Sequence, residues 1–170
     1  MRNKTMSALP AALLGLLLTA GTVTTAVAEP NVSERRAIAA YQEGAYVAKL
    51  QEVQAAAGFD VPVEVQWNSI ALSGYADSYA DEGFWTGIFF TPLTQALKEV
   101  ARDDMGKEAL KDKLKSVVVH YNKDTAPASA YEDGVSFADG VLTLNFQPYS
   151  NVDDVKERAA AIQKVLEAGL

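Results

Sequence analysis

The chain has 170 residues, with 15 Lys and Arg against 22 Asp and Glu, a formal net charge of −7 and no cysteine. An acidic surface repels the phosphates of DNA, RNA and anionic lipids, so we predict no nucleic-acid partner. The absence of cysteine excludes a disulfide, a thiolate metal site and a thiol nucleophile.

Residues 1–28 have the layout of a secretory signal peptide. Arg2 and Lys4 precede an apolar stretch from Ala8 to Ala20, and Ala26-Val27-Ala28 fits the small-x-small cleavage pattern. This stretch is shorter than the ~20 residues that span a bilayer, which favours cleavage over retention as an anchor. We therefore expect a secreted or periplasmic protein in which residues 29–170 form a single globular domain, with no membrane span after cleavage.

The first half of this domain is predicted to hold a helix and one or two strands. Residues 32–57 are expected to form one helix that Ser33 caps at its start. Residues 61–67, VPVEVQW, alternate apolar and polar side chains as a half-buried strand does. The stretch 68–90 is ambiguous, and its aromatic end FWTGIFF, 84–90, favours a further strand.

The second half begins with helices. Thr91 as a cap and Pro92 in the first turn predict a helix, and residues 107–115 predict a second helical piece. A strand is expected over 115–122. The last helix is expected after residue 150, with Ser150 or Asn151 as its cap.

The clearest local signal is a β-hairpin in VSFADGVLTLNF, residues 135–146. Asp139-Gly140 is a two-residue turn that tolerates positive φ. It pairs Ala138 with Val141, Phe137 with Leu142, and Val135 with Leu144. Turn chemistry and the apolar pattern agree on this register. Because several strands have one apolar and one polar face, we predict an α+β fold: a mostly antiparallel sheet of about four strands with helices packed on one face.

His120 is the only histidine of the chain and lies on a predicted strand. Alternation places it on the polar face of the sheet, together with Glu64, Gln66, Ser136, Thr143 and Asn145. Such a face can be an acid–base or binding site, with His120 as a group that titrates near neutral pH and Glu64 as its carboxylate. Alternation alone also explains a solvated polar face, and we favour that interpretation.

A second candidate is YADSYADE, residues 75–82, in which a Tyr-Ala-Asp triplet repeats. Two carboxylates, Asp77 and Asp81, lie near two phenols, Tyr75 and Tyr79. These groups could bind a cation, a sugar or a basic peptide. The EF-hand spacing is absent, and an acidic chain also exposes acidic loops without function, which is the interpretation we favour here. We predict no metal and no cofactor.

The motifs of several enzyme classes are absent, including the nucleophile elbow, the P-loop, the dinucleotide fingerprint and H-E-x-x-H. The sequence therefore favours a non-catalytic binding module for a basic protein, a peptide or a carbohydrate. One alternative is a small extracytoplasmic hydrolase that uses His120 with a carboxylate such as Glu64. Another is an envelope component that self-associates through the aromatic stretch Phe84 to Phe90.

Overall fold

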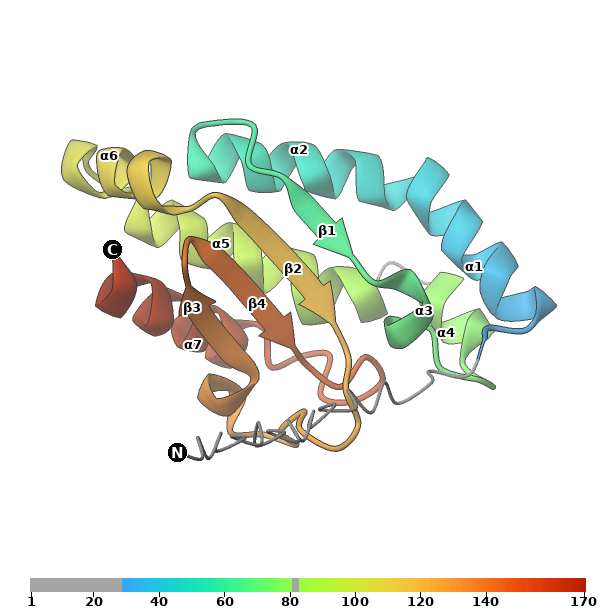
Figure 1. Cartoon of the computed structure of the whole chain (residues 1–170). Helices are drawn as coiled ribbons and strands as arrows, with labels where there is room; N and C mark the ends of the chain where they lie inside the picture. Colours follow the sequence, from blue (N-terminus) through green and yellow to red (C-terminus); the bar gives the residue numbers. More distant parts are fainter. Residues whose placement is uncertain (1–28, 81–82) are drawn as a thin grey trace, which may run out of the picture.

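The computed structural model describes residues 29–80 and 83–170, which form a four-stranded sheet with helices over one of its faces (Figure 1). The strands are β1 (Val63–Val65), β2 (Ser116–His120), β3 (Val135–Ala138) and β4 (Val141–Asn145). The α+β class is therefore confirmed. The predicted signal peptide lies outside the described residues.

The sheet is mixed and mostly parallel, so the prediction of a mostly antiparallel sheet was wrong. Its strand order is β1-β2-β4-β3, in which β1 and β4 both run parallel to β2. The 50 residues between β1 and β2 form helices, and a long crossover of this kind allows parallel pairing. Alternation of apolar and polar side chains reports that one face of a sheet is covered. It carries no information on strand direction.

The hairpin between β3 and β4 confirms the predicted register. Ala138 pairs with Val141, Phe137 with Leu142, and Val135 with Leu144. Asp139 and Gly140 have φ of 54° and 86°, the left-handed region that this turn requires. It is the only antiparallel pair of the sheet, and a short turn can specify it locally.

Two helices occupy the range where one was predicted. They are α1 (Val32–Glu43) and α2 (Ala45–Ala57), and the chain bends at Gly44 between them. Asn31 caps α1 instead of Ser33: its side chain accepts hydrogen bonds from the backbone of Ser33 and Glu34. Asn31 and Glu34 thus form a capping box, which satisfies backbone N–H groups that the helix leaves free.

Residues 61–90 contain less strand than predicted. Strand β1 covers only three residues, and Trp67 begins the short helix α3 (Trp67–Ile70). A second short helix, α4 (Ala76–Ala80), follows. The predicted strand at 84–90 was wrong, because this stretch contains a π-helical turn, η1 (Thr86–Phe90).

The π-helical turn runs without a break into α5 (Thr91–Val100), so Thr91 lies inside a helix and does not cap one. Proline inside a helix lacks an N–H and collides with the carbonyl four residues before it. The π-helical turn, in which each N–H bonds to the carbonyl five residues before it, ends just ahead of Pro92. The side chains of Trp85, Phe89 and Phe90 are fully buried, which leaves little of this stretch for an interface with a second copy.

The remaining helices are α6 (Asp104–Lys113), the 3₁₀ turn η2 (Tyr131–Gly134) and α7 (Val155–Gly169). Asp103 caps α6 by accepting a hydrogen bond from the N–H of Gly106. The expected cap of the last helix by Ser150 or Asn151 was wrong, because α7 begins only at Val155 and Asp154 precedes it without a side-chain cap.

The core lies between the sheet and helices α2, α5 and α7, which cover the same face (Figure 1). Its side chains from the sheet include Val117, Val119, Leu142 and Leu144, all fully buried. An aromatic cluster continues the core toward α1. There the Tyr41 ring packs edge-on against Trp85, with centroids 5.2 Å apart.

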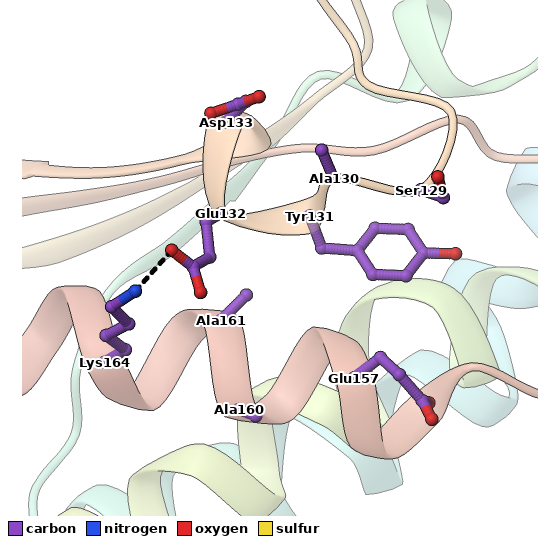
Figure 2. Close-up of a pocket in the computed structure, with 9 residues that line it drawn as sticks. All are labelled: Ser129, Ala130, Tyr131, Glu132, Asp133, Glu157, Ala160, Ala161 and Lys164. Atoms are coloured by element: carbon purple, nitrogen blue, oxygen red, sulfur yellow. Dashed lines mark hydrogen bonds and ion pairs between the residues drawn. The ribbon is translucent and has the colours of Figure 1, made fainter.

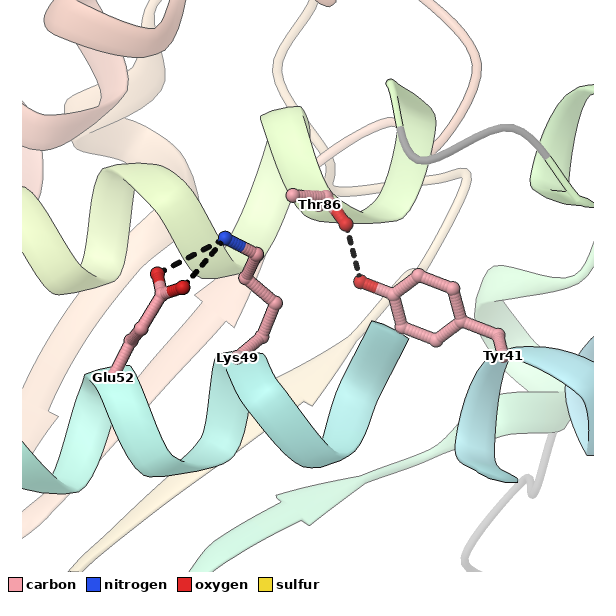
Figure 3. Close-up of polar contacts among 4 residues, drawn as sticks. All are labelled: Tyr41, Lys49, Glu52 and Thr86. Carbon is pink, nitrogen blue, oxygen red and sulfur yellow. Dashed lines mark hydrogen bonds and ion pairs between the residues drawn. The ribbon is translucent and has the colours of Figure 1, made fainter. Parts of the chain in front are cut away.

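Figure 3 shows that the Tyr41 hydroxyl is hydrogen-bonded to Thr86 at 2.6 Å, which joins α1 to the π-helical turn. Next to it, Lys49 and Glu52 form an ion pair along α2. No helix among the described residues is long and apolar enough to cross a membrane.

Candidate functional site

The structure separates the residues of the YADSYADE candidate. Tyr75 is 40% exposed, and Asp77 is exposed on α4. Tyr79 is fully buried, and its ring stacks on Trp85 with centroids 4.5 Å apart. Its hydroxyl accepts a hydrogen bond from the N–H of Leu72, so Tyr79 is a core residue that cannot contact a ligand. Asp81 lies outside the described residues.

His120 is half-buried at the end of β2, on the face of the sheet that the helices leave open. In the register of the sheet it pairs with Asn145, whereas Glu64 pairs with Val118. No hydrogen bond or ion pair joins His120 to Glu64 in the part of the chain that the structure describes. Burial lowers the pKa of His120 below its usual value, because desolvation disfavours the charged imidazolium.

Three tyrosines from separate segments meet at the carboxyl ends of the parallel strands. Tyr121 follows β2, Tyr149 follows β4, and Tyr75 precedes α4. The Tyr149 ring lies 5.4 Å from that of Tyr75 and 6.4 Å from that of Tyr121, nearly perpendicular to the latter. We call these three residues the tyrosine surface. The carboxyl edge of parallel strands is the usual place for ligands in such sheets.

A buried carboxylate holds the segment that carries Tyr75. Glu34 is 1% exposed, and one of its oxygens accepts a hydrogen bond of 3.0 Å from the N–H of Gly74. The other accepts one of 2.8 Å from the N–H of Asn31. One side chain thus completes the cap of α1 and fixes the turn directly before Tyr75.

Two buried polar side chains hold the segment that carries Tyr121. The hydroxyl of Ser69 accepts a hydrogen bond of 3.1 Å from the N–H of Tyr121 and donates to the carbonyl of Gln66. Asn145 accepts a hydrogen bond from the N–H of Asn122 and donates to the hydroxyl of Thr125. Both sides of the Tyr121 backbone are therefore fixed where the chain leaves β2.

A buried arginine holds the segment that carries Tyr149. Arg158 of α7 is 1% exposed, and its guanidinium donates to the carbonyls of Ser150 and Asn151 at 3.0 and 2.7 Å. Its central carbon lies 4.4 Å from the centroid of the Tyr131 ring, which packs over the cation. The turn after Tyr149 is therefore fixed from beneath.

These contacts account for four of the five buried polar residues in the described part of the chain. Glu34, Ser69, Asn145 and Arg158 each make at least one hydrogen bond to backbone within or next to the segments that carry the three tyrosines, and Thr94 is the fifth. Burial of a charged side chain costs free energy that its hydrogen bonds only partly return. Glu34 and Arg158 are buried despite this cost, and both are hydrogen-bonded to segments that hold the tyrosines in place.

Among the three tyrosines, Tyr121 has a clearly shifted pKa. Burial, a hydrogen bond with Tyr149 and the nearby carboxylate of Asp124 raise the pKa of Tyr121 to about 12. Burial also raises the pKa of Tyr79 beneath the surface, with a further contribution from Glu34. The tyrosine surface therefore offers aromatic rings close to the carboxylate of Asp124, a combination that suits binding more than nucleophilic attack.

Two hollows in the described part of the chain are not lined by these three tyrosines. One, of about 470 Å³, is a groove between η2 and α7 (Figure 2). There Glu132 is paired with Lys164 at 2.6 Å, and the side chains of Asp133 and Glu157 point away from one another. The other, of about 370 Å³, lies at Gln66 to Ser69. Because the polar groups of the groove do not converge, it is a weaker candidate than the tyrosine surface.

Sequence reasoning pointed to Tyr75 and Asp77 and placed Asn145 on the polar face of the sheet. It missed Tyr121 and Tyr149 and the buried roles of Glu34, Ser69 and Arg158. The strand predicted over residues 115–122 includes Tyr121, but β2 ends at His120 and Tyr121 lies beyond the sheet. In the sequence, Glu34 is recognised only as an acidic residue in the first turn of the helix predicted over residues 32–57. The signal that could have pointed to Arg158 is its place among Ala159, Ile162 and Leu166 on the buried side of the last helix.

No family model, curated protein or solved structure matches the chain. Within the described residues, no group of three or more His, Asp or Glu side chains could hold a metal ion. The tyrosine surface is thus identified from its own geometry.

Proposed function

We propose that this protein is an exported, non-catalytic binding module whose ligand rests on the tyrosine surface. The ligand classes that suit its composition are a basic protein, a peptide and a carbohydrate. The signal-like segment at residues 1–28 supports export, and the net charge of −7 favours ligands that are neutral or positively charged.

The observation that carries the proposal is the set of buried polar side chains around Tyr75, Tyr121 and Tyr149. A core of this size gains little stability from a buried glutamate and a buried arginine, since apolar side chains of similar volume are often as stable or more so. A surface that binds a ligand gains from rigid aromatic groups, because less conformational entropy is lost on binding.

The arrangement favours binding over catalysis. The chain's only histidine has no carboxylate partner among the described residues, and Glu64 lies beside Val118. The raised pKa of Tyr121 makes its phenol harder to deprotonate, which disfavours a role as a nucleophile. The hollows are open grooves, which suit an extended ligand better than a small substrate enclosed away from water.

The proposal is tested by native mass spectrometry of the chain purified gently from its extracytoplasmic fraction, followed by affinity measurement for any ligand retained. Tyr149→Ala should weaken that affinity at least several-fold, because a peptide or a carbohydrate then loses an aromatic ring to pack against. Met105→Ala is the control, because Met105 is 78% exposed on α6 and lies outside the surface. Equal affinity of both variants for the ligand would refute the proposed site.

A further inference from the structure

We propose that the tyrosine surface binds a positively charged alkylammonium group, namely the lysine side chain of a basic peptide, over the exposed ring of Tyr75. This inference rests on the proposed function and narrows it to one ligand class. Aromatic faces attract cations because the ring carries negative charge on its face, and the attraction increases when several rings are close together.

The rings are arranged so that more than one can contact the same cation. Tyr149 lies between the other two, tilted by 36° from Tyr75 and by 88° from Tyr121. The nearly perpendicular rings of Tyr121 and Tyr149 have the relative orientation of two walls of an aromatic cage, and Tyr75 packs beside Tyr149. The exposure of Tyr75, at 40%, leaves its ring accessible.

The charges around the rings have the sign that a cationic ligand requires. The carboxylate of Asp124 contributes to the raised pKa of Tyr121, and the carboxylate of Glu34 contributes to the raised pKa of Tyr79 beneath the surface. Asp77 is exposed two residues after Tyr75. Glu34 has both oxygens bonded to backbone N–H groups, whereas Asp77 and Asp124 are exposed carboxylates among the described residues.

The same chemistry disfavours the other ligand classes at this position. A phosphate or sulfate group would meet the exposed carboxylates of Asp77 and Asp124, which repel it. A neutral sugar could stack on Tyr75, but it has no charge that would form an ion pair with Asp77 or Asp124. A lysine side chain uses both features, since its ammonium meets the carboxylates while its methylene stem covers the ring.

The test is a titration of the full chain with hexalysine peptide, followed through the tyrosine ring resonances by NMR. Tyr75→Leu should bind hexalysine roughly two- to five-fold more weakly than Tyr75→Phe, because only phenylalanine keeps an aromatic face. Replacing both Asp77 and Asp124 by Asn should weaken binding and reduce its dependence on salt. Lys123→Gln is the charge control, since it removes a cation next to Asp124 and should leave binding as tight or tighter.

Equal binding by Tyr75→Leu and Tyr75→Phe would overturn the inference, because the contact would then be hydrophobic or a general attraction to negative charge. A parallel titration with chitohexaose, an uncharged oligosaccharide, separates this inference from the proposed function. If chitohexaose shifts the resonances of the tyrosine surface and hexalysine does not, the ligand class is wrong and the binding surface stands. If neither shifts them, the inference fails and the proposed surface loses its support.

Discussion

Replacement of Glu34 by Gln tests whether a buried carboxylate holds the turn before Tyr75. The change keeps the size of the side chain and removes its charge. An amide oxygen can still accept one of the two hydrogen bonds, from Asn31 or from Gly74. The amide nitrogen then faces the other backbone N–H, and two donors cannot bond to one another.

The expected cost follows from these contacts. A hydrogen bond to a charged group contributes about 1.5–3 kcal/mol, and an N–H left without an acceptor costs a similar amount. We therefore expect Glu34→Gln to lower the free energy of unfolding by about 2–3 kcal/mol. With a urea m-value of about 2 kcal/mol per M, the unfolding midpoint falls by about 1–1.5 M.

The assay is urea unfolding followed by tyrosine and tryptophan fluorescence, with Glu43→Gln as the matched control. Glu43 is exposed in the last turn of the same helix, so its replacement should change stability by less than about 0.5 kcal/mol. Binding measured at a urea concentration where both variants are folded should also weaken in Glu34→Gln, because the backbone before Tyr75 is less fixed. If the two variants unfold at the same urea concentration, Glu34 does not hold this turn and the argument from buried polar groups is wrong.

Three further predictions concern groups beneath and beside the tyrosine surface. Tyr79→Phe should lower the free energy of unfolding by about 1–2 kcal/mol, since it leaves the N–H of Leu72 without an acceptor. Urea unfolding checks this, with Tyr75→Phe as the control. Equal unfolding midpoints of the two variants would contradict the prediction. Burial lowers the pKa of His120, so as pH falls the unfolded chain takes up this proton at a higher pH than the folded chain does. Stability should therefore fall as pH drops below about 6.5. His120→Asn should flatten this dependence in thermal unfolding between about pH 5 and 7, and an unchanged slope would show that His120 is not responsible. Tyr121 has its pKa raised to about 12, so the folded protein should lose stability as pH rises from 10 toward 12, where the unfolded phenol ionises first. Tyr121→Phe should reduce that loss, as followed by phenolate absorbance and circular dichroism, and an identical loss in the variant would refute the assignment.

Part of the candidate site could be predicted from sequence and part could not. The repeated Tyr-Ala-Asp pattern pointed to Tyr75 and Asp77, because exposed aromatic and acidic residues are visible in a local pattern. The same pattern gave Tyr79 an equal role, although its ring stacks in the core on Trp85. A repeat states which residue types recur, whereas burial depends on what the rest of the chain packs against them.

The sequence by itself determined the hairpin, the apolar face of helix α5 and the burial of one face of the strands, because all three follow from local residue patterns. Asp139-Gly140 specifies its turn and register within 12 residues, and Leu93, Leu97 and Val100 repeat with the period of one helix face. Only the tertiary structure decided the parallel pairing of β1, β2 and β4 and the meeting of Tyr75, Tyr121 and Tyr149. Those pairings join segments that lie far apart in the chain, and no local preference encodes them. They are set by the packing of α2, α5 and α7 on one face of the sheet and by the buried hydrogen bonds of Glu34, Ser69, Asn145 and Arg158.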